Sequence, residues 1–262
     1  MRPITFLSDF GTSDTYAGQV KGAIATVAPE AVVVDLTHQV PAQDVRAGAF
    51  LLWTAVEAFP PGSVHLAVVD PGVGTARRAV AVRSARGDVF VGPDNGLLPM
   101  AIARLGGAQR SVELTNTEFH RLTPSDTFHG RDLFGPVAGY LARGTDVGLL
   151  GAEAGALASP YELPAPRREL DQWVGQVLHV DAYGNLITSF RSEHLPPRFE
   201  VVAGNRKIRG GASRSYQDVD TGDLLAVLGS AGLLELAVRD GNAALMLGLE
   251  RDAPVVVRPF GP

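Results

Sequence analysis

The first half of the chain alternates between short apolar runs and segments of helical periodicity, and this alternation limits the possible folds more than any other feature. Five apolar runs predict strands, at Ile4 to Leu7, Ala31 to Leu36, Val64 to Val69, Ala79 to Val82 and Val89 to Val91. Between the first three runs, apolar side chains recur every three or four residues from Tyr16 to Val27 and from Val45 to Phe59, as in amphipathic helices. This order predicts a Rossmann-like α/β domain with a mostly parallel sheet and helices on both faces.

The second half of the chain has a different pattern. The segment SPYELPAPRRELD (159–171) is rich in proline and charge, which is typical of a linker. Beyond it come short strand-like runs separated by turn residues such as Asn185 and the pairs Gly204-Asn205 and Gly241-Asn242, a pattern that predicts a small β-barrel. We therefore expect an α/β catalytic domain at 1–160, a linker at 161–172 and a β-barrel domain at 173–262.

Composition excludes several classes of protein. With 45% hydrophobic and 19% charged residues, the 262-residue chain is typical of a soluble globular protein, and its apolar runs are too short for a membrane span. The N-terminal MRPITFLSDFG is typical of a strand and not of a signal peptide, so we expect a cytoplasmic protein. Zero cysteines exclude disulfides, thiolate metal sites and thiol nucleophiles. A net charge of −5 with no basic run argues against a nucleic-acid partner.

Two acidic residues directly follow predicted strands. Asp9 follows the first strand, and Asp70 follows the third in the segment VVDPGVGTARR (68–78). Ligands of such sheets bind beyond the carboxyl ends of the strands, where one carboxylate at Asp9 can accept hydrogen bonds from both hydroxyls of a ribose. Asp-Pro-Gly is also ordinary turn chemistry. Two interpretations of the segment are therefore open: a tight turn that ends a buried strand, or a turn that presents Asp70 and Arg77 to a ligand.

Other polar clusters have both structural and functional interpretations. In SDFGTSDTYAG (8–18), Ser13 or Asp14 is expected to cap the next helix, and a single Gly11 does not make a dinucleotide-binding fingerprint. In TFHGRDLFGP (127–136), His129 is a candidate site residue, and Asp132 is expected to cap a helix. Two further segments have the pattern of hairpins with possible ligand groups, at Asp181 and Asn185 in VDAYGNLITS (180–189) and at Glu235 and Asn242 in GSAGLLELAVRDGNAA (229–244).

Six segments in chain order together resemble one family, the S-adenosyl-L-methionine (SAM) hydroxide adenosyltransferases. These are adenosine-forming SAM hydrolases, related to bacterial fluorinases and chlorinases. The six segments are SDFG (8–11), VVDLTH (33–38), VDPGVGTARR (69–78), VGPDNGLL (91–98), TFHGRDLFGP (127–136) and DAYGNLITS (181–189). The resemblance spans essentially the whole chain. It implies an N-terminal α/β domain, a C-terminal β-barrel and a homotrimer whose site lies between the first domain of one subunit and the second domain of a neighbour.

The resemblance also implies a reaction and a role for each site residue. SAM and water would give adenosine and L-methionine, with the water handled by Asp70, Arg77 and His129. Asp9 would bind the ribose, Asn185 the adenine and Asp181 the methionine amine. The segment expected to close over the adenine contains Ser230, Glu235 and Val238. A sulfonium is a good leaving group, so positioning water and removing its proton are the main tasks, and ordinary acids, bases and amides suffice. We therefore expect no metal and no cofactor, with SAM as the substrate.

Three alternatives remain from the sequence. A halogenase of the same fold would carry tyrosine at the position of Asp70 and no histidine at that of His129, and a carboxylate beside a halide would repel it by several kcal/mol. A metal-dependent hydrolase could use Asp9, Asp14, Asp70 and His129, although no HxH or HExxH spacing is present. A non-catalytic sensor of SAM or adenosine is the third.

Overall fold

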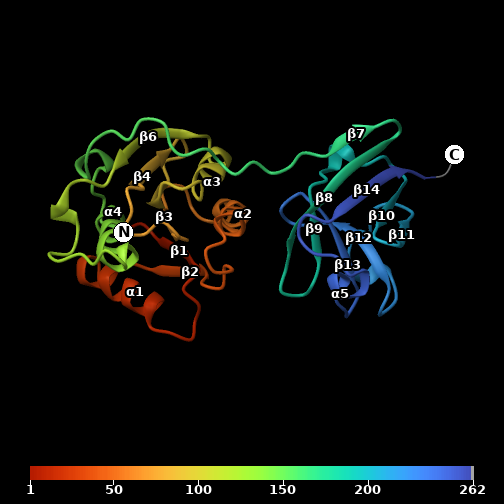
Figure 1. The fold of residues 1–262 in the computed structure, drawn as a ribbon, viewed down its shortest axis with the longest axis horizontal. Helices are drawn as coiled ribbons and strands as arrows, with labels where there is room; N and C mark the ends of the chain where they lie inside the picture. Colours follow the sequence, from red (N-terminus) through yellow and green to blue (C-terminus); the bar gives the residue numbers. More distant parts are fainter. Residues whose placement is uncertain (261–262) are drawn as a thin grey trace. The chain divides into compact units, whose positions relative to one another are not determined.

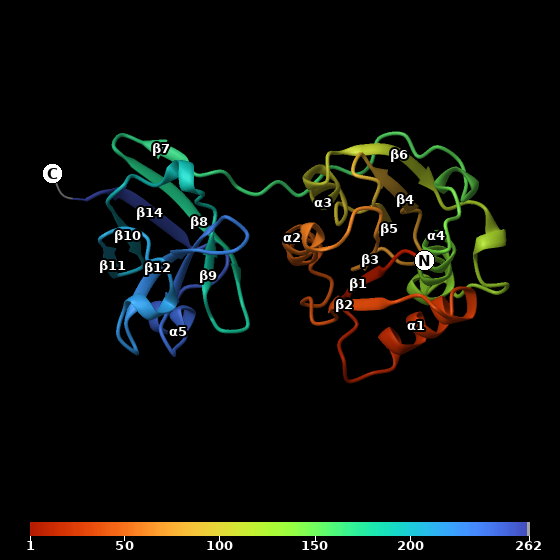
Figure 2. The ribbon, with the colours of Figure 1, turned by 180° about the vertical axis from the view of Figure 1, so that it is seen from behind.

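The chain forms two compact units. The computed structural model describes residues 1–260 and divides the chain into Met1–Tyr161 and Glu162–Pro262. Figures 1 and 2 show the elements of each unit from opposite sides. Within residues 1–260, no helix combines the length and the apolar character that crossing a membrane requires.

A six-stranded sheet forms the centre of the first unit. In sequence its strands are β1 (Ile4–Ser8), β2 (Val33–Thr37), β3 (Val64–Val68), β4 (Ala79–Ser84), β5 (Val89–Pro93) and β6 (Ala108–Glu113). In space the order is β2-β1-β3-β5-β4-β6; β2, β1, β3 and β5 are parallel to one another, whereas β4 is antiparallel to both β5 and β6. The sheet is mixed because β4 runs opposite to the other five strands, so the expectation of a mostly parallel sheet holds except at β4. Only residues 85–88 join β4 to β5, and a connection that short can join only antiparallel neighbours.

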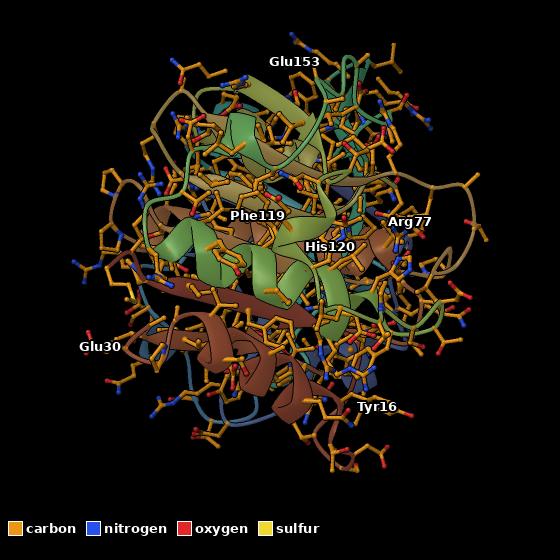
Figure 3. The ribbon with its side chains drawn as sticks, turned by 90° about the vertical axis from the view of Figure 1, so that its left-hand side faces the viewer. Tyr16, Glu30, Arg77, Phe119, His120 and Glu153 are labelled. Carbon is orange, nitrogen blue, oxygen red and sulfur yellow. The ribbon has the colours of Figure 1, made fainter. Side chains whose placement is uncertain are left out.

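Helices cover both faces of this sheet, as the alternating pattern predicts. On one face α1 (Tyr16–Val27) packs against α4 (Gly135–Ala142), and Figure 3 looks onto this pair. Their apolar side chains join those of β1 and β3 in one buried core, in which Phe6, Leu66 and Phe134 are fully buried. On the other face lie α2 (Val45–Ala55) and α3 (Pro99–Arg104), which contact each other.

Helix ends depart from the prediction at two places. The N-cap of α1 is Thr15, whose side chain makes no capping hydrogen bond, so Ser13 and Asp14 do not cap this helix. The second predicted helix ends as an α-helix at Ala55 and continues only as a 3₁₀ turn, Val56–Ala58, before Pro60. Further single-turn segments are Thr117–Phe119, the π-helical Gly130–Phe134 and Val147–Leu149.

The second unit is an antiparallel sheet that nearly closes on itself. Its strands are β7 (Arg167–Glu169), β8 (Gln172–Val180), β9 (Leu186–Thr188), β10 (Phe199–Ala203), β11 (Arg206–Arg209), β12 (Leu224–Leu228), β13 (Leu234–Val238) and β14 (Pro254–Pro259). They follow the order β11-β10-β14-β8-β9-β13-β12, with β7 paired to β8. Ser213, just after β11, forms a bridge to Val227 of β12 at the opposite end of this order, so the sheet is barrel-like.

Short helices and an enclosed apolar core complete this unit. The short elements are the helix α5 (Ala243–Leu247) and the 3₁₀ turns Ser192–His194 and Tyr216–Asp218. The core includes Phe190, Val201 and Leu234, which are fully buried. The predicted linker at 161–172 is only partly a linker, because β7 within it pairs with β8 as an edge strand.

Candidate active site

Two predicted acids and an arginine lie at the same edge of the first sheet. Strands β1 and β3 are parallel neighbours in which Ser8 pairs with Val68, so Asp9 and Asp70 follow at similar levels. Because β4 runs in the opposite direction, it begins at this edge, and Ala79 pairs with the last residue of β5. The antiparallel β4 thus explains how Arg77, just before the strand, returns to the edge where Asp70 lies.

The loop between β3 and β4 is folded by its own hydrogen bonds. The amide of Val73 donates to the carbonyl of Asp70 at 3.2 Å, and the Thr75 hydroxyl donates to the carbonyl of Gly72 at 2.6 Å. Gly74 has a φ of +76°, and a Cβ there would lie only 2.6 Å from the carbonyl oxygen of Asp126. The glycine is required both by its backbone conformation and by this contact with the loop that leads to His129.

Arg77 joins the other two members of the predicted set. Its Nε lies 2.9 and 3.0 Å from the two carboxylate oxygens of Asp70, and its Nη2 lies 2.5 Å from Oδ2. The same Nη2 lies 2.7 Å from Nδ1 of His129. Only 10% of the Arg77 side chain and 6% of the Asp70 side chain are exposed, and the guanidinium lies over the ring of Phe134. The turn after β3 therefore does not only end the strand, because it also brings Asp70 and Arg77 together in a buried charged cluster with His129.

The contact with Arg77 determines which nitrogen of His129 carries the proton. A guanidinium has only donors, so Nδ1 of His129 accepts, and a neutral imidazole must then carry its proton on Nε2. Burial lowers the pKa of His129, and the positive charge of Arg77 lowers it further, against smaller opposing effects of nearby carboxylates. At neutral pH, His129 is an uncharged group that can donate a hydrogen bond through Nε2.

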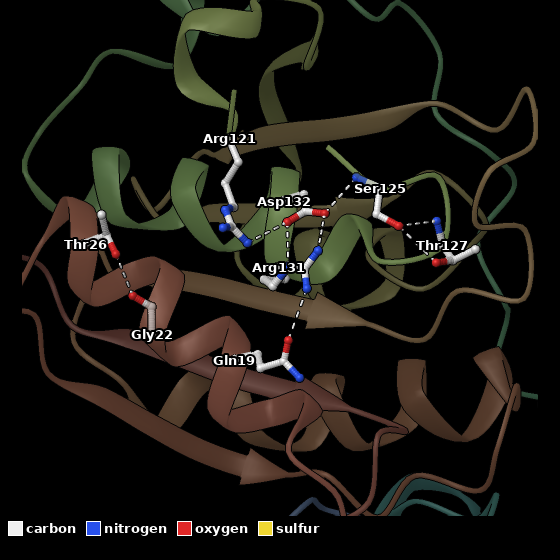
Figure 4. Close-up of polar contacts among 8 residues, drawn as sticks. All are labelled: Gln19, Gly22, Thr26, Arg121, Ser125, Thr127, Arg131 and Asp132. Atoms are coloured by element: carbon white, nitrogen blue, oxygen red, sulfur yellow. Dashed lines mark hydrogen bonds and ion pairs between the residues drawn. The ribbon is translucent and has the colours of Figure 1, made fainter. Parts of the chain in front are cut away.

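Asp132 holds the loop that precedes His129. Its carboxylate is fully buried and accepts hydrogen bonds from the amide of Ser125 at 2.8 Å, from Nε of Arg131 at 2.7 Å and from Nη1 of Arg121 at 3.2 Å (Figure 4). Burial would raise the pKa of Asp132, but these donors outweigh it and the pKa is lowered. Asp132 therefore anchors the loop and does not cap the following helix, whose turn starts after His129.

The first-unit residues line a cavity of about 410 Å³. Asp9, Asp70 and His129 all contribute to its wall. Arg77 is not part of the wall but contacts Asp70 and His129 through its guanidinium. Three aromatic residues of this wall were not predicted as site residues: Phe10, Tyr16 and Phe128, whose ring centroids lie 5.4 to 6.1 Å apart. Phe10 directly follows Asp9 in SDFG, and Phe128 directly precedes His129 in TFHG. Their position next to predicted site residues could have indicated that they line the cavity.

The Phe10 ring also explains the glycine after His129. A Cβ on Gly130 would lie 3.1 Å from Cζ of Phe10 and 3.4 Å from the Phe128 ring. Gly130 therefore lets the loop after β1 approach the loop that carries His129.

The second unit has a cavity of about 810 Å³ at its own predicted residues. Five of the six candidates of this unit line it: Asp181, Asn185, Ser230, Glu235 and Val238. The carboxylate of Asp181 accepts hydrogen bonds from the amides of Tyr183 and Asn185 and from the Asn185 side chain, each at 2.9 Å. Asn242, in contrast, caps α5 through the amide of Leu245.

Glu235 has a partner that the sequence did not indicate. The Tyr216 hydroxyl donates to Oε2 of Glu235 at 3.0 Å, and both residues line the same cavity. Burial raises the pKa of Glu235, and the charge of Asp181 adds to this, against the opposing effect of Tyr216. Burial and the charge of Glu235 raise the pKa of Tyr216 to about 12. Tyr216 comes from a 3₁₀ turn far from the motifs, and no local sequence signal marks it.

The geometry does not assemble the metal site considered from the sequence. Within residues 1–260, no group of three or more His, Asp or Glu side chains is arranged so that it could hold a metal ion. Asp14 is exposed and is not among the residues that line the cavity with Asp9 and Asp70.

Comparisons with known proteins agree with the motif pattern. Residues 4–151 match the model of the SAM hydroxide adenosyltransferase N-terminal domain, and residues 175–256 match that of the C-terminal domain. The chain is 43% identical over 253 residues to an (R)-S-adenosyl-L-methionine hydrolase of Salinispora tropica, with 94% of each chain covered. It is 42% identical to an (R)-S-adenosyl-L-methionine hydrolase of Thermus thermophilus, covering 97% of this chain and 99% of the other.

Two further comparisons extend the picture. A fluorinase of Actinopolyspora mzabensis is 26% identical over 293 residues, with 98% of this chain and 97% of the fluorinase covered. The crystal structure of an uncharacterized conserved protein from Thermotoga maritima superposes with a TM-score of 0.90 at 33% identity, covering 97% of this chain and 99% of that one. Both domain models and the near-complete coverage lead to one conclusion: this chain belongs to the SAM hydroxide adenosyltransferase family.

Proposed function

We propose that this protein hydrolyses SAM to adenosine and L-methionine by attack of water at C5′ of the substrate. One observation carries the proposal: Arg77 joins Asp70 and His129 in the wall of the cavity that also contains Asp9. One cavity therefore holds a carboxylate able to accept a proton, a histidine able to donate a hydrogen bond and a second carboxylate suited to a ribose. The names of the relatives at 42% and 43% identity support this substrate.

Binding of the nucleoside is assigned to Asp9. Its Oδ2 accepts a hydrogen bond from the amide of Gln43 at 2.8 Å, which fixes the orientation of the carboxylate at the cavity wall. A fixed carboxylate can accept hydrogen bonds from both hydroxyls of a ribose. The carboxylates of Asp9 and Asp70 also favour a positively charged sulfonium in the same cavity.

The second-unit cavity supplies groups for the two ends of the substrate. We assign adenine to Asn185, with Ser230, Glu235 and Val238 beside it, and the methionine amine to Asp181. Three hydrogen bonds orient the Asp181 carboxylate, and a carboxylate can accept about four, so it can accept one more from an ammonium group.

The chemical step assigns different tasks to Asp70 and His129. Water attacks C5′ in line with the C5′–S bond; as the C–O bond forms, the C–S bond breaks and its electron pair stays on sulfur, giving methionine. The water proton passes to Asp70, because His129 already carries its proton on Nε2 and can only orient the water by donating to its oxygen. Arg77 fixes the orientation of both groups, which prepares the site before the transition state forms.

Product analysis tests this function. The purified protein is incubated with SAM in ¹⁸O-labelled water, and we expect adenosine carrying the label at O5′ together with unlabelled L-methionine. Asp70→Asn should lower turnover by about 10²–10⁴-fold, the range for a positioned acid–base group. Asp94→Asn is the matched control, since Asp94 pairs with Arg78 and not with Arg77.

Other outcomes of this assay identify the alternatives. A 5′-halogenated nucleoside formed in chloride or fluoride would identify a halogenase, and SAM binding without product would identify a sensor. We also propose that no metal or other cofactor is needed, so turnover should survive excess EDTA. Full loss in EDTA, with recovery on adding a divalent ion, would contradict this.

Assembly and location complete the proposal. We propose a homotrimer in which a neighbouring subunit supplies the second half of each site, since Asp70 and Asn185 line cavities of different units. Mixing Asp70→Ala and Asn185→Ala proteins under subunit exchange should then restore part of the activity, and no recovery despite exchange would contradict it. Sedimentation measures the subunit number, and cell fractionation tests the expected cytoplasmic location. The parallel run β2-β1-β3-β5 with helices on both faces supports the description of the first unit as Rossmann-like.

A further inference from the structure

His38, the last residue of the VVDLTH segment, has no role in the mechanism above. It is only 6% exposed and is not part of the cavity wall, yet it makes contacts through both ring nitrogens. Its Nδ1 lies 2.7 Å from the hydroxyl of Ser8, and its Nε2 lies 3.1 Å from Oδ1 of Asp35. The other oxygen of Asp35 accepts a hydrogen bond from Nζ of Lys21 at 2.6 Å. Four side chains thus form one line that ends at the last residue of β1.

The negative charge of Asp35 determines which nitrogen of His38 carries the proton. Burial would raise the pKa of Asp35, but the hydrogen bond from Lys21 and the nearby His38 ring outweigh it, so the pKa is lowered and the group is a carboxylate. Nε2 of His38 faces this carboxylate, so a neutral imidazole carries its proton there, although the geometry of the contact falls short of a hydrogen bond; Nδ1 then accepts from the Ser8 hydroxyl. The Ser8 oxygen in turn faces the amide of Phe10 at 3.4 Å.

The backbone of His38 holds the same loop from its other side. Its carbonyl accepts a hydrogen bond from the amide of Gly11 at 2.7 Å, while its ring holds Ser8. These two contacts bracket Asp9 and Phe10, which are the two residues of this loop in the cavity wall. The ring of Phe6, with its centroid 4.6 Å from that of His38, keeps the imidazole in place.

We propose that His38 is a positioning residue, which through Ser8 and Gly11 fixes Asp9 in the orientation that a ribose diol requires. The ribose rests on the proposed function, whereas the positioning of the loop does not. Asp35 sets the tautomer of His38, and Lys21 holds the other oxygen of Asp35. The VVDLTH segment therefore serves the site without touching the substrate.

The same strand contains a matched control. Thr5 Oγ1 lies 2.9 Å from Nδ1 of His65, whose Nε2 lies 3.3 Å from Oδ1 of Asp88. This is again a hydroxyl, an imidazole and a carboxylate, all fully buried. Thr5 lies three residues before Ser8, roughly 10 Å along the strand and away from the cavity edge. A purely structural role predicts that the two arrangements respond alike to loss of the hydroxyl.

The first experiment measures hydrogen exchange at the Gly11 amide in the full-length protein, without any ligand. Ser8→Ala and His38→Leu should speed this exchange by roughly fivefold to tenfold relative to the wild type, the equivalent of one lost hydrogen bond. Thr5→Val should leave it within about twofold even though it removes the same kind of hydroxyl–imidazole contact. His38→Asn, whose amide oxygen can still accept from Ser8, should restore much of the protection.

The second experiment measures affinities for adenosine and 2′-deoxyadenosine by calorimetry. The wild type and Thr5→Val should prefer adenosine by about tenfold or more, because Asp9 is a charged acceptor for the 2′-hydroxyl. Ser8→Ala and His38→Leu should reduce this preference by about fivefold, and His38→Asn should recover it.

Each outcome has a definite meaning. If Gly11 exchange and nucleoside preference change in Ser8→Ala no more than in Thr5→Val, the positioning role is wrong. If the exchange difference is found but wild-type protein releases no adenosine from SAM, the proposed function fails and the positioning of the loop stands. Unfolding of His38→Leu would leave Ser8→Ala and His38→Asn to decide, since the first keeps the imidazole and the second keeps an acceptor for the Ser8 hydroxyl.

Discussion

Replacing Arg77 by lysine separates its charge from its geometry. The guanidinium reaches both Asp70 oxygens and Nδ1 of His129 from one rigid plane. A lysine keeps the positive charge and can contact Asp70, but one ammonium on a flexible stem does not hold both partners in this arrangement. Arg77→Lys should therefore preserve the charge of the cluster and lose the link to His129.

The structure sets the size of the expected effect. One charge-assisted hydrogen bond to His129 and one of the contacts to Asp70 are lost; a hydrogen bond of this kind contributes about 1.5–3 kcal/mol. If one such contribution acts only in the transition state, turnover should fall by about 10–150-fold with SAM affinity nearly unchanged. Arg77→Ala should lose more, and should also destabilise the fold by about 3–5 kcal/mol, because Asp70 remains buried without its partner.

The assay is single-turnover release of adenosine, with SAM affinity measured by calorimetry on the same preparations. The control is Arg78→Lys in the adjacent position. Arg78 pairs with Asp94 and with the carbonyls of Ala154 and Ala156, and is not part of the cavity wall. This variant should lose stability but keep turnover. Turnover of Arg77→Lys within twofold of the wild type, or a loss explained entirely by weaker SAM binding, would refute the role assigned to the Arg77–His129 contact.

Three further predictions concern single groups. Asp9→Asn should weaken adenosine binding by about 1–3 kcal/mol and remove most of the preference over 2′-deoxyadenosine; equal affinities before and after the change, measured by calorimetry, would leave Asp9 only a turn residue. Burial would raise the pKa of Asp88, but hydrogen bonds from His65 and Arg86 lower this pKa to about 2. The ionised Asp88 therefore contributes about 2 kcal/mol to the free energy of unfolding above pH 4, and this contribution is lost as the pH falls from 4 through 2. Asp88→Asn should therefore be less stable at pH 7 in urea denaturation, with a difference that shrinks towards pH 2. Burial and Arg77 lower the pKa of His129, so on acidification turnover should persist to a pH below the ordinary histidine value of 6.5. A pH–rate profile that loses half of its activity on acidification at or above pH 6.5 would contradict the neutral state of His129.

The sequence predicted the strands and the acids at their ends because both are local signals. Apolar runs such as Val64 to Val69 form buried strands, and the residue after a parallel strand must lie at the carboxyl edge of the sheet. The direction of β4 was not predicted, since a short apolar run is the same in either direction and only the short connection at 85–88 decides it. Asp132 was assigned to the wrong task because its three donors include Ser125 and Arg121, which only the folded loop brings to it.

Within the site, charge chemistry was easier to predict than apolar surroundings. Asp9, Asp70 and His129 stood out as residue types suited to ribose binding and proton transfer, and the structure places them in one cavity. The state of His129 could not be predicted, because it depends on one nitrogen of Arg77, 52 positions away in sequence. Tyr216 was missed for the same reason: its contact with Glu235 spans 19 positions and joins two elements that are not neighbours in the chain.

The contact between Gly74 and Asp126 restricts how this enzyme family can change its chemistry. With 2.6 Å between a Cβ position on one loop and a carbonyl on the other, the loop bearing Asp70 and Arg77 has no clearance from the loop leading to His129. Any residue other than glycine at position 74 would place its Cβ against this carbonyl unless the second loop moved. Conversion between water and halide as nucleophile should therefore require exchange of both loops together, and libraries that vary residues 70–78 alone should yield mostly inactive protein.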